Sequence, residues 1–388
     1  MEEFGIYVHI PFCKKKCYYC DFVSFECKEN EIEKYIDAII KEINQKEVIE
    51  KENQIIKNFV GKKVTTIYIG GGTPSLIDSK YIVEILNAIK LKYEVVENVE
   101  ITIEVNPGTV TEEKLIDYKN AGINRISIGL QSAEDRILKL IGRIHTYEQF
   151  LNTYNLAKKV GFKNINVDLM LAIPTQTEKE LIDSIIKVVN LNPTHISLYS
   201  LILEENTKLE ELIESKELEL INDEIERKMY WKTKNFLKKN GYNQYEISNF
   251  SKKDFESKHN MNCWNQEQYI GYGLAAHSYF NNVRFSNTCD LDEYLKILND
   301  TKIEEIIEIE EVQNRPEKTK EYMMLGLRKI KGVSISDFER KFRINPLFYF
   351  RFELEKLENQ GLIEIDLDNI FLTPKGLDLA NQVFEEFV

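Results

Sequence analysis

Short apolar strand patterns alternate with longer amphipathic helix patterns through residues 1–205 of this chain. The expected strands are Gly5–Ile10, Val64–Gly70, Val99–Val105, Arg125–Leu130, Asn164–Leu171 and His195–Leu201. The expected helices are Glu31–Ile49, Ser79–Lys90, Thr111–Ala121, Tyr147–Val160 and Glu178–Asn190. Crossover connections of this length join parallel strands, whereas antiparallel strands can be joined by tight hairpins. The alternation therefore predicts an α/β fold with a parallel sheet, either a partial (β/α)6 barrel of the TIM type or a doubly wound sheet.

The pattern changes after residue 205. A long charged helix is expected at 223–240, followed by "GYNQYEISNFS" as a strand and by a segment rich in His, Trp, Tyr and Gly. Residues 302–320 are acidic and end in "NRPEKTK", which we expect to be a linker. The remaining residues predict helices followed by a β-hairpin, the layout of a small winged-helix domain. We therefore expect a barrel at 1–205, a further β/α segment at 206–305 and a winged-helix-like domain at 306–388.

Charge and composition exclude several classes of protein. The 388 residues carry 51 Lys and Arg against 64 Asp and Glu, a net charge of −13. Such a chain repels phosphate, so no nucleic-acid partner is expected, even for the winged-helix-like part. The sequence has no pattern of a signal peptide or membrane-spanning helix, which favours a cytoplasmic protein with reduced thiols. Cys27, Cys263 and Cys289 occur singly, and we expect them to be packing or surface residues.

Three of the six cysteines lie within eight residues, directly after the first expected strand. Cys13, Cys17 and Cys20 have the spacing C-x3-C-x2-C. Three thiolates on a four-iron cubane would leave one iron open to a small chelating molecule. The neighbouring residues Lys14–Lys16 are expected to favour the thiolate forms. The alternative is a zinc site completed by His9, although a strand residue four positions before Cys13 is badly placed to close a tetrahedron.

Polar or glycine residues follow the next strands, where an α/β sheet gathers its chemistry. The second strand ends in "GGGTPS", whose glycines let a ligand approach the backbone closely. The third and fourth strands end in Glu104 and Gln131, and Asp168 lies on the fifth. Arg143 can reach a carboxylate as a bidentate fork. Each of these residues alone is ordinary, but together, beside the three cysteines, they predict a cofactor pocket.

These motifs resemble the radical S-adenosylmethionine (SAM) superfamily. The resemblance implies that Cys13, Cys17 and Cys20 hold a [4Fe-4S] cluster and that the amino and carboxylate groups of SAM chelate its open iron. Reduction of the cluster would then cleave SAM to a 5′-deoxyadenosyl radical. The fold implied is the partial (β/α)6 TIM-like barrel.

The complete motif set is similar to that of the oxygen-independent coproporphyrinogen III oxidase-like family. These motifs are "YVHIPFC…C.YCDF", "GGGTPS", "E.NPG", "GLQS" and "D.....P.QT". The residues that the resemblance places around a first SAM are Tyr7, Gly71, Glu104, Gln131, Arg143 and Asp168. Those that match contacts to a second SAM are Tyr19, Gly72 and Thr73.

This family has an oxidase branch and a branch of heme chaperones of the HemW type. The oxidases have a fourth cysteine where this chain has Phe22, and a long arm before the first strand, whereas Tyr7 is close to Met1. The chaperones have an H-N-x-x-Y-W motif, matched here by His259-Asn260-Met261-Asn262-Cys263-Trp264 with Cys263 in place of Tyr. The resemblance therefore implies a protein that binds heme, with a cluster and SAM governing transfer to a membrane or respiratory heme protein. The alternatives are oxidative decarboxylation of coproporphyrinogen III and a radical SAM reaction on another substrate.

His259 and Trp264 are the expected heme residues. Imidazole is a common axial ligand of heme iron, and Trp264, with Tyr269 and Tyr272, would offer flat apolar surface. Cys263 is the alternative iron ligand, and His277 is expected in the pocket wall. The competing interpretation of His259 is a hydrogen-bonded structural histidine.

Overall fold

The six expected strands form and lie parallel in one sheet. The computed structural model describes residues 3–26, 28–46, 49–51, 54–56, 61–300 and 303–388, so Cys27 lies outside the described residues. The strands run in the order β10-β9-β8-β7-β6-β1. Their bounds are β1 Glu3–Ile10, β6 Lys63–Gly71, β7 Glu94–Val105, β8 Arg125–Gln131, β9 Asn164–Leu171 and β10 His195–Ser200. The predicted α/β fold with a parallel sheet is confirmed.

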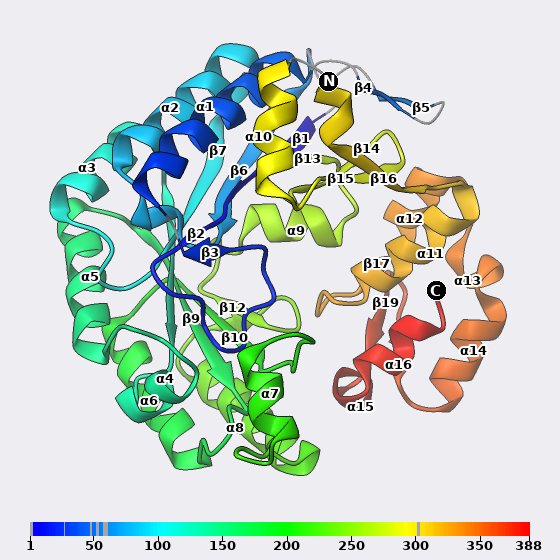
Figure 1. The fold of residues 1–388 in the computed structure, drawn as a ribbon. Coiled ribbons are helices and arrows are strands. Elements are labelled where there is room, and N and C mark those ends of the chain that lie inside the picture. The colour runs from blue at the N-terminus through cyan, green and yellow to red at the C-terminus, as the bar shows by residue number, and fades with distance from the viewer. Residues whose placement is uncertain (1–2, 27, 47–48, 52–53, 57–60, 301–302) are drawn as a thin grey trace.

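Helices between these strands cover one face of the sheet, on the left in Figure 1. They are α1 Glu29–Gln45, α2 Ser79–Lys92, α3 Glu112–Asn120, α4 Asp135–Leu140, α5 Tyr147–Val160 and α6 Glu178–Leu191, with a 3-10 turn η1 Pro74–Leu76. The starts of α5 and α6 are fixed by capping boxes at Thr146 and Thr177. The expected helix end at Ile49 is wrong, because Ile49–Lys51 forms β4, which pairs with β5 Gln54–Ile56.

Side chains alternate between the two faces of the sheet, which separates core from site. On β7, Ile101 and Ile103 belong to the main hydrophobic core, while Thr102 and Glu104 lie on the other face. On β8, Ile126 and Ile128 are core residues and Ser127 lies between them. The concave face of the sheet therefore carries polar side chains.

The sheet continues at both edges, and twelve strands belong to it among the described residues. On one side, β13 Tyr269–Tyr272 runs parallel to β1, followed by antiparallel β14 His277–Phe280, β15 Val283–Asn287 and β16 Ile307–Val312. On the other side lie β12 Asn249–Ser251 and β11 Asn243–Gln244. The segment "GYNQYEISNFS" is therefore two short antiparallel strands and not one. The associated helices are α7 Lys208–Glu214, α8 Asp223–Lys239, α9 Lys258–Trp264, α10 Leu291–Asp300 and η2 Ile303–Ile306.

The C-terminal residues have a hydrophobic core of their own, including Tyr322, Phe338 and Leu357. The helices are α11 Arg315–Gly326, α12 Ile335–Phe342, α13 Pro346–Tyr349, α14 Arg351–Asn359, α15 Pro374–Asp378 and α16 Ala380–Glu385. The sheet of this part is β17 Val333–Ser334, β19 Asn369–Leu372 and β18 Ile363–Ile365, in that order. The predicted β-hairpin is confirmed as β18–β19. The winged-helix assignment and the three-part division stay predictions, and β16 carries the main sheet past residue 306.

The predicted linker at 302–320 is wrong, because residues 303–312 form η2 and β16 and the final "NRPEKTK" begins α11. Asn314 caps α11, and its side chain and that of Glu317 form a capping box, with Pro316 in the first turn. These residues are a helix start signal rather than a flexible connection. Among the described residues, no helix is both long and apolar enough to cross a membrane.

Candidate functional site

The three clustered cysteines line one cavity of about 270 Å³ at the carboxyl ends of the parallel strands. The loop that carries them is closed by a short parallel pair, β2 Phe12–Cys13 and β3 Phe25–Glu26. All three thiols are free, with Cys13 buried and Cys17 and Cys20 half-buried. The cavity therefore presents three sulfur ligands on one side.

Burial raises the pKa of the Cys13 thiol and raises the pKa of Cys20 to about 11. Lys16 lowers the pKa of Cys20, as expected for a lysine that favours the thiolate, but burial raises this pKa by more. The three lysines are exposed around the loop. A metal centre that binds such thiols displaces their protons.

The cavity brings together nearly all the residues predicted from the sequence. Its lining includes Tyr19, Gly71, Gly72, Thr73, Glu104, Gln131, Arg143 and Asp168. They come from the ends of β6, β7 and β8, from β9 and from the cysteine loop, except Arg143, which lies between α4 and α5, so the carboxyl ends of neighbouring strands meet as expected. Tyr7 does not line the cavity and lies below it, stacked on Tyr68 with ring centroids 6.4 Å apart.

The glycine turn after β6 lies against the cysteine loop. A Cβ on Gly72 would stand 2.9 Å from the Phe12 oxygen and 3.0 Å from the Cys13 sulfur. Gly71 has a φ of +110°, and a Cβ there would stand 2.7 Å from the His9 ring. Only glycine fits at these two positions, because a side chain would meet the cysteine loop or His9, and both glycines line the cavity beside the sulfurs.

Glu104 is the acidic group nearest this turn. Its Oε1 accepts a hydrogen bond from the Tyr68 hydroxyl at 2.8 Å, and its Oε2 accepts one from the Gly71 amide at 3.2 Å. Burial raises the pKa of Glu104 to about 7, with the negative charge of Asp168 contributing, although the Tyr68 hydrogen bond opposes this. The carboxyl group therefore changes its protonation near neutral pH.

Arg143 connects the cysteine loop to the strand ends. Its guanidinium donates to Asn106 Oδ1 at 2.8 Å, to Gly129 O at 2.5 Å and to the Cys17 sulfur at 3.6 Å. Asn106 in turn donates to the Thr73 hydroxyl at 2.8 Å. The Nε of Arg143 is buried without a partner, so one donor remains for a bound group.

Gln131 and Asp168 form the other wall. Gln131 has a φ of +69°, a left-handed conformation that is strained outside glycine, and its side chain accepts from the Tyr199 hydroxyl at 2.7 Å. Asp168 accepts from Ser127 at 3.2 Å and from Asn166 at 2.6 Å. Burial raises the pKa of Asp168.

The zinc alternative with His9 does not form. Both ring nitrogens of His9 are engaged, Nδ1 with the Tyr7 hydroxyl at 3.0 Å and Nε2 with Val23 O at 2.8 Å. Across the described residues, no group of three His, Cys, Asp or Glu side chains is placed to hold one metal ion. His9 instead fixes the end of the cysteine loop against β1.

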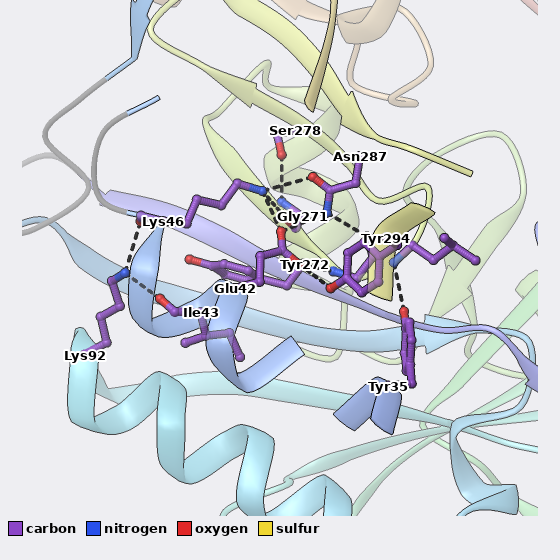
Figure 2. A network of polar contacts seen from close by, with 12 residues as sticks. Tyr35, Glu42, Ile43, Lys46, Lys92, Gly271, Tyr272, Ser278, Asn287 and Tyr294 are labelled. Atoms are coloured by element: carbon purple, nitrogen blue, oxygen red, sulfur yellow. Dashed lines mark hydrogen bonds and ion pairs between the residues drawn. The ribbon is translucent and has the colours of Figure 1, made fainter. Parts of the chain in front are cut away.

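Figure 2 shows a buried polar network around Glu42 and Lys46, at the end of α1. Glu42 of α1 and Lys46, which directly follows the helix, form an ion pair at 2.8 Å, and neither side chain is exposed. Glu42 also accepts from the Asn287 amide, the Gly273 N–H and the Tyr294 hydroxyl, at 2.8, 2.8 and 2.6 Å. The two charges are paired with each other. The network connects α1 to α10 and to the strands added beside β1, β13 to β16, which we call the sheet extension.

This network reaches the cysteine loop through Tyr35. The Tyr35 hydroxyl donates to the backbone oxygen of His9 at 2.9 Å and accepts from the Leu274 amide at 2.8 Å. His9 then holds Val23 at the far end of the loop. The position of the loop therefore depends on contacts made by α1.

The expected heme ligand His259 lies inside the molecule, below the cavity. It is 8% exposed, its Nδ1 bonds the Thr66 hydroxyl at 2.9 Å, and its ring lies 5.2 Å from that of Tyr68. Burial lowers the pKa of His259 to about 4, so the imidazole is neutral at physiological pH. Tyr68, which lines the cavity, thus contacts this ring.

The other aromatic residues of the expected heme surface are dispersed. The Cζ of Arg328 lies 4.5 Å from the centroid of the Trp264 ring, so the guanidinium group covers this ring. Tyr272 is fully buried, with its hydroxyl 2.5 Å from that of Tyr93, and so offers no open surface. His277 has an exposed side chain paired with Glu310 at 3.0 Å. Cys263 is half-buried on α9.

Several residues of the cavity were not predicted from the sequence. They are Lys15, Phe22, Ser24, Tyr68, Asn106, Ser127 and Tyr199. Alternation across the sheet could have found two of them, because Tyr68 pairs with Thr102, two residues before Glu104, and Ser127 pairs with Glu104 itself, which was predicted. Asn106 lies within the quoted "E.NPG" motif, and its role follows only from the contact with Arg143.

Comparison with known proteins identifies the family. Residues 7–187 match the Radical SAM superfamily, and residues 313–379 match the HemN C-terminal domain. The heme chaperone HemW of Lactococcus lactis is 38% identical over 385 residues, which cover 98% of this chain and 96% of that protein. HemW of Bacillus subtilis is 35% identical over 383 residues, 98% of each chain. This chain belongs to the HemW family of radical SAM proteins.

The fold of the HemW-family chain matches that of a solved radical SAM enzyme. The structure of coproporphyrinogen III oxidase (HemN) from Escherichia coli superimposes with a TM-score of 0.84. The match covers 100% of this chain and 90% of that one, at 22% sequence identity. At this identity the likeness shows the fold.

The residues of this HemW-family site fit the two cofactors of the superfamily, a [4Fe-4S] cluster and SAM. Three thiols face one cavity, and the glycine turn beside them has no room for a Cβ. The unpartnered Nε of Arg143 and the carboxyl groups of Glu104 and Asp168 supply polar partners for a nucleoside and an amino acid. The donor set thus matches both groups.

Proposed function

We propose that this protein is a heme chaperone, which binds heme and passes it to an acceptor protein. The observation that carries the proposal is the full-length identity to HemW proteins, together with a cavity that holds the three thiols and the expected SAM residues. The acceptor is proposed to be a membrane or respiratory heme protein, and the site of action the cytoplasm.

The cavity residues have separate roles in this proposal. Cys13, Cys17 and Cys20 hold the cluster, which supplies the electron for SAM chemistry when bound. Gly71 positions the amino group of a first SAM, and the carboxyl group of Glu104 accepts from its donors. The remaining proposed contacts to the first SAM are Tyr7, Gln131, Arg143 and Asp168. Those proposed for a second SAM are Tyr19, Gly72 and Thr73.

The affinity for SAM is expected to rise roughly tenfold between about pH 6 and about pH 8. The pKa of Glu104 is raised to about 7, so the carboxyl is mostly protonated at the lower pH and ionised at the higher one. The ionised form accepts hydrogen bonds from SAM, and the protonated form accepts fewer. Isothermal titration at several pH values measures this. The pH dependence should be much weaker in Glu104→Gln, and an unchanged slope in that variant would contradict the role.

Heme binding is proposed to use His259, which requires α9 to move outward because the ring is enclosed. In an anaerobic heme titration followed by Soret absorbance, His259→Ala is expected to weaken binding at least tenfold, since the axial ligand is lost. His277→Ala is the control, because this imidazole is exposed and lies outside the helix. Loss of heme binding in His277→Ala but not in His259→Ala would instead identify His277, on β14, as the axial ligand.

The same preparation tests the proposed function as a whole. Heme bound by the wild type, with transfer to an apo-acceptor and no conversion of coproporphyrinogen III, supports a chaperone. Turnover of coproporphyrinogen III under anaerobic reducing conditions, with no heme bound, would replace the proposal with an oxidase.

A further inference from the structure

A chain of hydrogen bonds leads from the cavity to the helix that carries His259. It begins at Asp168, whose carboxylate accepts from the side-chain amide of Asn166 at 2.6 Å. Asn166 is 1% exposed, and its other end accepts from His195 Nδ1 at 2.6 Å. The amide orientation is fixed, because only its NH2 group can donate to a carboxylate.

The next two links have fixed directions for the same reason. His195 is fully buried, and its Nδ1 must carry the proton that Asn166 accepts. Its Nε2 is then an acceptor, and the Tyr245 hydroxyl donates to it at 2.8 Å. The Tyr245 oxygen accepts from the backbone N–H of Ser257 at 3.2 Å. Every donor in the chain points toward Asp168.

The chain ends at the first turn of α9. Ser257 is the N-cap of this helix, and its side chain accepts from the Asn260 amide. The same turn is held by Glu100, which accepts from the amides of Lys258 and His259 at 3.2 and 3.1 Å. Tyr245 therefore supports the start of the helix in which His259 is the second residue.

We infer that Asn166, His195 and Tyr245 are positioning residues through which a ligand on Asp168 changes the heme affinity of α9. This inference rests on the proposed function. A nucleoside hydroxyl that donates to Asp168 competes with the Asn166 amide for the carboxylate. Because hydrogen bonds in a chain strengthen one another, loss of this first bond also weakens the bonds from His195, Tyr245 and Ser257. The N-terminus of α9 is then held less firmly, so His259 reaches heme more easily. By linkage, heme tightens SAM binding by the same factor.

The test compares heme affinity with and without SAM in protein with a reconstituted cluster. In the wild type, SAM is expected to tighten heme binding by about fivefold or more. In Tyr245→Phe, the affinity without SAM should rise toward the wild-type value with SAM, and SAM should have little further effect. Tyr242→Phe is the matched control, because it loses one buried phenol contact, to Pro193 O, at the same sheet edge.

Hydrogen exchange gives a readout that needs no heme. SAM is expected to accelerate exchange of the Ser257 amide in the wild type and to have no effect on it in Tyr245→Phe, where the acceptor is absent. Unchanged exchange in the wild type, or an equal SAM effect on heme affinity in both proteins, overturns the inference. A wild type that binds no heme contradicts the proposed function instead. In that case the exchange rate of the Ser257 amide still tests whether SAM acts on α9 through the chain of hydrogen bonds.

Discussion

Cys17→Ala is expected to lower bound iron at least tenfold, from about four atoms per chain in the anaerobically reconstituted wild type. Cys17 lines the cavity with Cys13 and Cys20, and its sulfur accepts from Arg143. Two remaining thiolates cannot hold a cubane that already leaves one iron without a protein ligand. Iron and sulfide analysis, with the electron paramagnetic resonance spectrum of the reduced protein, measures the loss.

Cys289→Ala is the matched control for this prediction. Cys289 is a free, exposed thiol outside the cavity. Its replacement should leave the iron content and the spectrum unchanged. Full cluster content in Cys17→Ala, or an equal loss in Cys289→Ala, would contradict the assignment of the three clustered cysteines.

The sequence was sufficient for the central sheet because its elements are local. Each strand is a short β-branched run, and parallel strands bring their carboxyl ends to one edge. That single rule placed Gly71, Glu104, Gln131 and Asp168 around one cavity. Predicted element boundaries were wrong where one local pattern is typical of two structures. Pro316 and the charges near it suggested a linker, but they form the capped start of a helix.

The buried, hydrogen-bonded position of His259 agrees with the competing interpretation offered from the sequence, and it depends on contacts far apart along the chain. Its partner Thr66 is 193 residues away, on β6, and the amides of its helix bond Glu100 on β7. Nothing near "HNMNCW" distinguishes a residue that faces solvent from one that is turned into the sheet. The neutral cavity residues Tyr68 and Tyr199 were missed because tyrosines on strands are common core residues.

Lys46→Met is expected to destabilise the fold by about 3–5 kcal/mol. Lys46 and Glu42 are both fully buried, and removal of the lysine leaves the Glu42 carboxylate without its counter-charge (Figure 2). Lys46 also donates to Gly271 O at 3.0 Å and to Asn287 at 3.3 Å, so contacts to the sheet extension are lost as well. Urea unfolding followed by circular dichroism measures the change.

A second substitution separates charge from packing in this network. Glu42→Gln combined with Lys46→Met removes both charges, and this pair should lose less stability than Lys46→Met alone, because no uncompensated charge stays buried. The control is a surface ion pair, Lys159 with Glu112, in which both side chains are over a third exposed. Lys159→Met should change the free energy of unfolding by no more than about 0.5 kcal/mol.

A double variant less stable than Lys46→Met would mean that hydrogen bonds of Glu42, rather than its charge, hold α1 against the sheet extension. The cluster content of the same variants connects this to the site, since Tyr35 and His9 transmit the position of α1 to the cysteine loop.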